Sequence, residues 1–122
     1  MADPRHALGI AAEDAVAGWL TAAGWRVVGR RLRTARGGEI DVLAIDPGQA
    51  LVAVEVRARR TSRTGAAAVT VDARRVERLR HALASAAAEH RVRSSGLRVD
   101  LVTVEPDQAP GRWRLTRLVG IG

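Results

Sequence analysis

Apolar residues recur at helical spacing in two stretches of the chain. Between Pro4 and Ala23 they return every three or four residues, and Gly24 then supplies a typical helix stop. The second stretch runs from about Ala73 to His90, and Asp72 is a typical N-cap for it. The apolar positions are Leu8, Ala12, Val16, Trp19, Leu20 and Ala23 in the first stretch, and Val76, Leu79, Leu83 and Ala87 in the second. We therefore expect two amphipathic helices, the second with a line of arginines beside its apolar face.

The other apolar segments have the length and the branched residues of strands. The expected strands are Trp25–Arg33, Glu39–Ile45, Ala50–Ala58, Leu97–Glu105 and Arg112–Val119. The turn residues Asp46 to Gln49 predict an antiparallel hairpin of the second and third strands. The second helix is expected to be the crossover between two parallel strands. The fold class is therefore α/β, a mixed sheet of about five strands flanked by helices in the order α-β-β-β-α-β-β.

Length and composition exclude several classes of protein. A chain of 122 residues without an internal repeat or linker predicts a single domain over residues 1–122. The absence of cysteine excludes disulfides, thiolate metal sites and a cysteine nucleophile. No apolar run approaches the roughly 20 residues that span a bilayer, and residues 1–6 lack the pattern of a secretory signal. We expect a cytoplasmic protein with no membrane partner, and the sequence leaves its oligomeric state open, a homodimer included.

The charge balance points to a polyanionic partner. The formal net charge is +7, and all 20 basic residues are arginine. Arginine binds phosphate through its planar fork, so an arginine-rich face suits a nucleic-acid backbone. A compositional bias of the coding sequence also explains arginine in place of surface lysine, and charge alone does not separate the two explanations. We expect nucleic acid, most simply DNA, as the partner.

Two acids lie where apolar residues are expected. Glu55 shares one face of the third strand with Arg57, and burying such charges is costly unless they are paired or bind a ligand. Asp41 lies in the apolar run of the second strand, on the face that alternation also gives to Glu39, Leu43 and Ile45. Asp41 and Glu55 are opposite each other if the hairpin loop has an odd number of residues centred on Gly48. A loop of residues 47–49 satisfies this, with Gly48 in a conformation that most residues avoid.

Two explanations of this acidic pair stay open. Adjacent carboxylates repel each other, and a hard cation such as Mg²⁺ or Mn²⁺ relieves the repulsion through oxygen ligands. Alternatively, Asp41, Glu55 and Arg57 form a structural ion pair across the hairpin. Glu13 favours the first explanation, because the small residues Gly9 and Ala17 one turn away leave its carboxylate reachable. Glu13 can equally be an ordinary solvated helix glutamate.

These residues resemble a known family, the YraN-like uncharacterised proteins, similar in turn to archaeal Holliday-junction resolvases and the PD-(D/E)XK nuclease superfamily. The resemblance covers nearly the whole chain. It rests on Leu8-Gly9 with Glu13, Gly38-Glu39-Ile40-Asp41, Leu51-Val52, Val54-Glu55-Val56-Arg57 with Arg59, the segment from Val71 to Leu79, and Arg98-Val99-Asp100. It implies a restriction-endonuclease-like three-layer core, with Asp41 and Glu55 as metal ligands and Glu13 as an accessory acid of the catalytic site.

The sequence departs from the family pattern at Arg57, where the family usually has lysine. Lysine can orient or deprotonate an attacking water, whereas arginine stays protonated and can only position the water or offset negative charge. The same bias that removed every other lysine would also account for Arg57 in a working site. The resemblance therefore implies either a magnesium- or manganese-dependent DNA nuclease, acting on branched or structured DNA, or a catalytically weak nucleic-acid-binding module on the same fold. An adaptor that binds a protein partner is a third hypothesis, and it leaves the basic surplus unexplained.

The remaining candidates are arginines and tryptophans. Arg59, Arg60 and Arg63 follow the expected site, and with Arg75 of the second helix they are the expected nucleic-acid contacts. Trp19, Trp25 and Trp113 are expected in the core. His6, His81 and His90 are too scattered for a zinc site, and the last two are expected at the surface of the second helix.

Overall fold

The structure is a computed structural model that describes residues 4–35, 37–59, 72–109 and 111–121. The elements along the chain are α1 (Pro4–Ala22), β1 (Arg26–Arg33), β2 (Glu39–Ile45), β3 (Leu51–Ala58), α2 (Ala73–His90), β4 (Leu97–Pro106) and β5 (Trp113–Leu118). Every bound lies within one residue of its expected position, and the order α-β-β-β-α-β-β is confirmed. Asp72 caps α2 through its side chain, and Gly24 has a left-handed φ of 89° just beyond α1.

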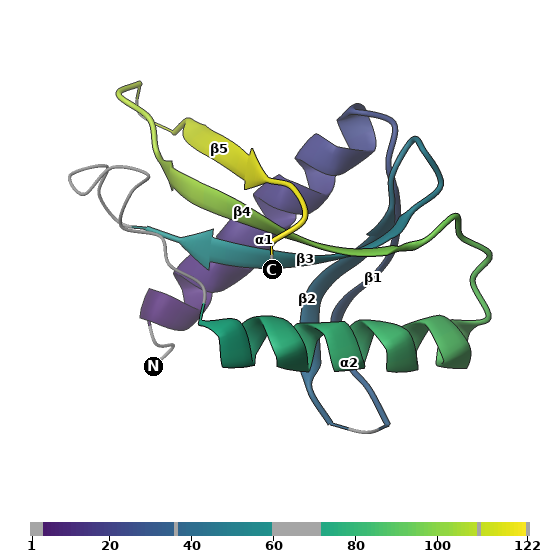
Figure 1. Ribbon diagram of the computed structural model, residues 1–122. Helices are drawn as coiled ribbons and strands as arrows, with labels where there is room; N and C mark the ends of the chain where they lie inside the picture. Colours follow the sequence, from purple (N-terminus) through teal and green to yellow (C-terminus); the bar gives the residue numbers. More distant parts are fainter. Residues whose placement is uncertain (1–3, 36, 60–71, 110, 122) are drawn as a thin grey trace.

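The strands form one mixed five-stranded sheet in the order β1-β2-β3-β4-β5. β3 and β4 are parallel, with α2 as the crossover between them, and the other neighbours are antiparallel. The helices lie on opposite faces of this sheet, which gives three layers (Figure 1). The α/β fold class expected from the pattern is therefore confirmed.

Each face of the sheet has its own apolar core. The core under α1 is formed by Ala12, Val16, Leu20, Trp25, Val42, Ala44, Val52, Val54, Val102 and Val104. The core under α2 is formed by Ile40, Leu43, Ile45, Leu51, Ala53, Leu79, Ala82, Leu83, Ala86 and Val99. β2 and β3 contribute to both cores because successive strand residues point to opposite faces. The central strands are therefore rigid supports for any side chain at their ends.

The tryptophans divide between core and surface. Trp25 is buried, and the half-buried Trp113 packs against the α1 core, as expected. The expectation for Trp19 is wrong, because its side chain is 39% exposed. Trp19 directly precedes the fully buried Leu20, and a neighbour one position away points about 100° around a helix. The expectation that His81 and His90 lie at the surface is confirmed.

The β2–β3 hairpin has the expected register but not the expected glycine geometry. Val42 pairs with Val54 and Ile45 with Leu51, which centres the turn on residue 48. Asp46 N–H donates to Ala50 C=O, and Gln49 N–H donates to Asp46 C=O. This is a three-residue loop whose last residue is left-handed, so Gln49 (φ 71°) and not Gly48 takes that conformation.

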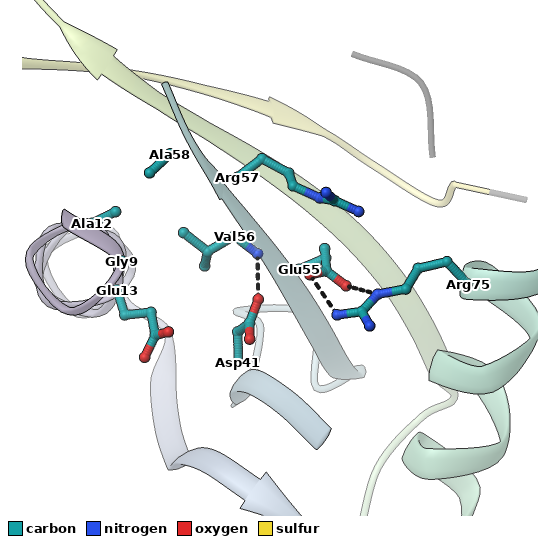
Figure 2. Close-up of a pocket in the computed structure, with 9 residues that line it drawn as sticks. All are labelled: Gly9, Ala12, Glu13, Asp41, Glu55, Val56, Arg57, Ala58 and Arg75. Carbon is teal, nitrogen blue, oxygen red and sulfur yellow. Dashed lines mark hydrogen bonds and ion pairs between the residues drawn. The ribbon is translucent and has the colours of Figure 1, made fainter. Parts of the chain in front are cut away.

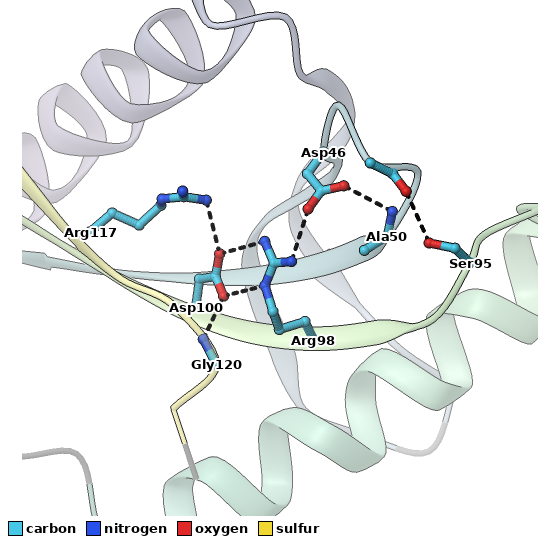
Figure 3. Close-up of polar contacts among 8 residues, drawn as sticks. Asp46, Ala50, Ser95, Arg98, Asp100, Arg117 and Gly120 are labelled. Carbon is cyan, nitrogen blue, oxygen red and sulfur yellow. Dashed lines mark hydrogen bonds and ion pairs between the residues drawn. The ribbon is translucent and has the colours of Figure 1, made fainter.

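A buried charge network ties the C-terminal strand to the rest of the sheet (Figure 3). The fully buried Asp100 carboxylate accepts hydrogen bonds from Arg98, Arg117 and the Gly120 N–H. Arg98 also donates to Asp46 at 2.8 Å, at the start of the hairpin turn. The guanidinium groups of Arg98 and Arg117 lie 5.9 and 5.1 Å, respectively, from the centre of the Trp25 ring, which adds a cation–π attraction. These contacts compensate the charge of Asp100, which is one of the residues that carry the family resemblance. Asp100 therefore has a structural role.

None of the helices in the described ranges is long and apolar enough to cross a membrane.

Candidate functional site

The candidate site lies where β2 separates from β3. The paired register of these strands ends at Val42 and Val54. Beyond that point the Val56 N–H donates to the Asp41 carboxylate at 2.9 Å. A side-chain oxygen thus occupies the place that a backbone carbonyl would fill in a continued ladder. The Asp41 carboxylate therefore lies close to the plane of the sheet, at the opening between the two strands.

The face predicted for Asp41 needs a correction. Ile40 packs in the α2 core with Leu43 and Ile45, whereas Val42 packs in the α1 core. Alternation along β2 therefore breaks between Ile40 and Val42, and Asp41 lies at the break. The carboxylate of Asp41 still lies beside Glu55, but because of this break and not because of strict alternation.

A pocket of about 330 Å³ collects the predicted acids (Figure 2). Its lining residues are Gly9, Ala12, Glu13, Asp41, Glu55, Val56, Arg57, Ala58 and Arg75. The acids come from three separate elements, α1, β2 and β3, and in Figure 2 Asp41 lies between Glu13 and Glu55. The small residues Gly9 and Ala12 keep the α1 side of the pocket open. The structure therefore brings Glu13 of α1 and Asp41 of β2 together with Glu55 and Arg57 of β3.

Asp41 is the acid whose charge is least compensated. Burial, and to a smaller extent the neighbouring Glu55 and Glu13, raise the pKa of its carboxyl from the ordinary 3.8 to about 7. The Val56 N–H opposes this shift, because a donor favours the charged form. Near neutral pH the ionised Asp41 carboxylate therefore lowers the stability of the folded protein, and a bound cation would offset this loss of stability.

Glu55 is paired with Arg75 of α2. Arg75 Nε donates to Glu55 Oε2 at 2.9 Å, and Nη2 donates to Oε1 at 3.0 Å. Glu55 is 3% exposed, so this two-point pair compensates a carboxylate that has almost no access to water. Arg75, expected to contact nucleic acid, is in this structure the partner of a candidate metal ligand.

Glu13 is paired with Arg31 of β1. Arg31 Nε donates to Glu13 Oε1 at 2.6 Å. Arg31 has a left-handed φ of 50°, which costs a non-glycine residue about 1 kcal/mol or more. The pairs of Arg30 with Val42 and of Leu32 with Ile40 place Arg31 opposite Asp41. Both β1 and β2 are thus irregular at the same point, beside the pocket.

The other predicted arginines are placed as follows. Arg57 lines the pocket, and its side chain is exposed to solvent. Arg59 follows the end of β3, and its N–H donates to Val104 C=O. Arg60 and Arg63 lie outside the described residues.

The oxygen donors fit a hard cation such as Mg²⁺ or Mn²⁺. In the ranges that the structure describes, no three His, Cys, Asp or Glu side chains form a ready ligand cluster. Zinc sites need three or four protein ligands, and this pocket does not supply them. Mg²⁺ is commonly held by one or two carboxylates and keeps several waters. Asp41 and Glu55 would be those two ligands.

Sequence reasoning missed the two arginine partners of the acids. A usable signal exists for Arg75, which precedes the buried Leu79 by four residues and therefore shares its side of α2. No comparable signal identifies Arg31, because its contact depends on the left-handed backbone of β1.

Comparison with known proteins places this chain beside one family. The model of the uncharacterised protein family UPF0102 matches residues 12–104. A UPF0102 protein of Arthrobacter sp. (strain FB24) is 40% identical over 119 residues, which cover 97% of this chain and 98% of the relative. A UPF0102 protein of Bordetella avium is 42% identical over 91% of this chain and 74% of its own length, and one of Deinococcus radiodurans is 35% identical over 92% and 91%. The matched region contains Glu13, Asp41, Glu55, Arg57 and Arg75.

The raised pKa of Asp41 predicts that Asp41→Asn stabilises the protein at alkaline pH. An acid whose pKa is higher in the folded chain binds its proton more tightly there, so its contribution to stability falls as the pH rises from about 4 to above 7. In EDTA, Asp41→Asn should raise Tm on the order of 5 °C at pH 8.5 and change it little at pH 4. Thermal unfolding at both pH values checks this, with Asp107→Asn, an exposed turn residue, as the control for net charge. A lower Tm for Asp41→Asn at pH 8.5 would contradict the assignment.

Proposed function

The chain belongs to the uncharacterised protein family UPF0102, and we propose its function from the pocket: a metal-dependent nuclease that hydrolyses DNA phosphodiester bonds. The observation that carries the proposal is the convergence of Glu13, Asp41 and Glu55 from three elements on one pocket beside arginines. Structural ion pairs alone do not explain it, because the described residues give Glu13 and Glu55 an arginine each, whereas Asp41 accepts a hydrogen bond from the Val56 N–H and its pKa is raised.

The substrate class follows from charge. The chain carries a net charge of +7, and Arg57 and Arg75 line the same pocket as the acids. Arginine forks suit phosphate oxygens, and backbone contacts of this kind give sequence-independent affinity. The resemblance to Holliday-junction resolvases makes branched or structured DNA the substrate to test first. The proposal includes a cytoplasmic location, where such DNA occurs.

The roles of the residues follow from their positions. Asp41 and Glu55 would hold the cation, and Glu13 would add an accessory carboxylate on the α1 side of the pocket. Mg²⁺ or Mn²⁺, when bound, supplies charge neutralisation at the scissile phosphate and a more acidic water. Arg57 would orient the phosphate and offset its charge, because a guanidinium does not give up a proton near neutral pH. The fixed charge of Arg57 also supports the second candidate, a weakly catalytic module that binds nucleic acid.

Cleavage assays test the proposed activity. Linear duplex, single-stranded and four-way-junction DNA should be cut in Mg²⁺ or Mn²⁺ and left intact in EDTA. Asp41→Asn should lower the rate at least about a hundredfold without loss of folding, because it removes a metal ligand and no core packing. Asp107→Asn, far from the pocket in sequence and exposed, should leave the rate unchanged. Cleavage that persists in EDTA or in Asp41→Asn would refute a metal-dependent site at these residues.

Arg57→Lys separates the two candidate functions. A lysine at this position can exchange a proton with water, and general acid–base help is typically worth on the order of a hundredfold. The nuclease proposal therefore predicts a faster cut by Arg57→Lys, measured as the single-turnover rate on the best DNA substrate. Arg93→Lys, on the exposed segment after α2, is the matched control.

An inactive Arg57→Lys protein that still binds DNA and Mn²⁺ would favour the binding module. A wild-type protein that cuts fast and loses activity in Arg57→Lys would make arginine itself the working residue.

A further inference from the structure

The Glu55–Arg75 pair occupies the carboxylate that the proposed metal site needs. Both Glu55 oxygens accept hydrogen bonds from the Arg75 fork, at 2.9 and 3.0 Å. With Glu55 only 3% exposed, solvent does little to screen its interactions with nearby cations. A divalent cation on Glu55 would therefore lie within a few ångströms of a fixed positive charge and be repelled by it.

Arg75 itself is free to leave Glu55. Its side chain is 37% exposed, whereas that of Glu55 is 4% exposed. It lies in the first turn of α2, and it lines both the acidic pocket and a small adjacent pocket with Glu39 and Arg78. A rotamer change would turn its fork toward solvent without disturbing the buried face of the helix.

We propose that Arg75 is an exchangeable counter-ion: it compensates Glu55 until a divalent cation binds there, and it then binds a phosphate of the nucleic acid. The inference rests on the proposed function and adds the order in which the cation and the phosphate bind. Because the cation must displace Arg75 from Glu55, the intact pair lowers the affinity for the cation, and by linkage the bound cation raises the affinity of Arg75 for phosphate. Cation and nucleic acid therefore bind cooperatively through one side chain.

A purely structural Arg75 makes the opposite prediction. If Arg75 served only to hold Glu55 in position, its loss would leave the carboxylate disordered and would weaken cation binding. If Arg75 competes with the cation, its loss strengthens binding. The sign of the change in affinity thus decides between the two roles.

Mn²⁺ titration by calorimetry tests the competition, without DNA and without any cleavage. Arg75→Gln should bind Mn²⁺ about tenfold more tightly than the wild type, within the usual range of coupling between sites. Arg74→Gln removes the same charge from the neighbouring exposed position of α2 and should change the affinity by no more than about twofold. Equal or weaker binding by Arg75→Gln, with measurable binding by the wild type, overturns the inference alone. No Mn²⁺ binding by any of the three proteins overturns the proposed metal site as well.

DNA binding in Ca²⁺, which commonly occupies such sites without supporting cleavage, tests the second half of the proposal. Fluorescence anisotropy should show that Ca²⁺ increases the DNA affinity of the wild type and of Arg74→Gln by a larger factor than that of Arg75→Gln. Identical factors for all three proteins would contradict the transfer of Arg75 to phosphate.

Arg75→Lys covers the case in which Arg75→Gln fails to fold with an uncompensated Glu55. Lysine keeps the charge but loses the two-point fork. We expect Mn²⁺ to bind Arg75→Lys more tightly than the wild type and to raise its Tm by more. A smaller Tm increase than that of the wild type would overturn the competition.

Discussion

The point at which β2 separates from β3 determines where every acid of the candidate site lies. The two strands are paired up to Val42 and Val54. Beyond this point the Asp41 carboxylate accepts a hydrogen bond from the Val56 N–H. This opens the sheet without leaving that donor unsatisfied, which would be costly in a buried strand. Carboxylates from both faces can then approach one another through the opening. A regular ladder would have kept Glu13 and Glu55 on opposite sides of a closed sheet.

Once the acids are together, charge compensation connects the fold to the chemistry. Glu13 is held by Arg31 and Glu55 by Arg75, while Asp41 relies on a backbone N–H. Asp100 differs from these acids. That acid is fully buried, yet two arginines and a backbone N–H satisfy it, and it serves the fold. The pocket acids are less completely compensated, as expected for groups that bind a ligand.

Much of this arrangement could be predicted from the sequence because local signals agree with the global fold. The turn after β2 fixes an odd loop, and the register centred on residue 48 brings the ends of β2 and β3 that carry Asp41 and Glu55 next to each other. The break in alternation at Asp41 could not be predicted, because it depends on how β1 and β2 bend together at Arg31. The Glu55–Arg75 pair, which joins a strand to the crossover helix, was missed although the four-residue spacing from Arg75 to the buried Leu79 places both on one side of α2.

The central claim is that Asp41 and Glu55 share a divalent cation, and anomalous diffraction from crystals grown with Mn²⁺ tests it most directly. The account predicts one strong manganese peak in the pocket, with an oxygen of each carboxylate within about 2.0–2.3 Å and the Arg75 fork turned away from Glu55. A pocket without manganese at millimolar concentration, with the Glu55–Arg75 pair intact, would contradict the account.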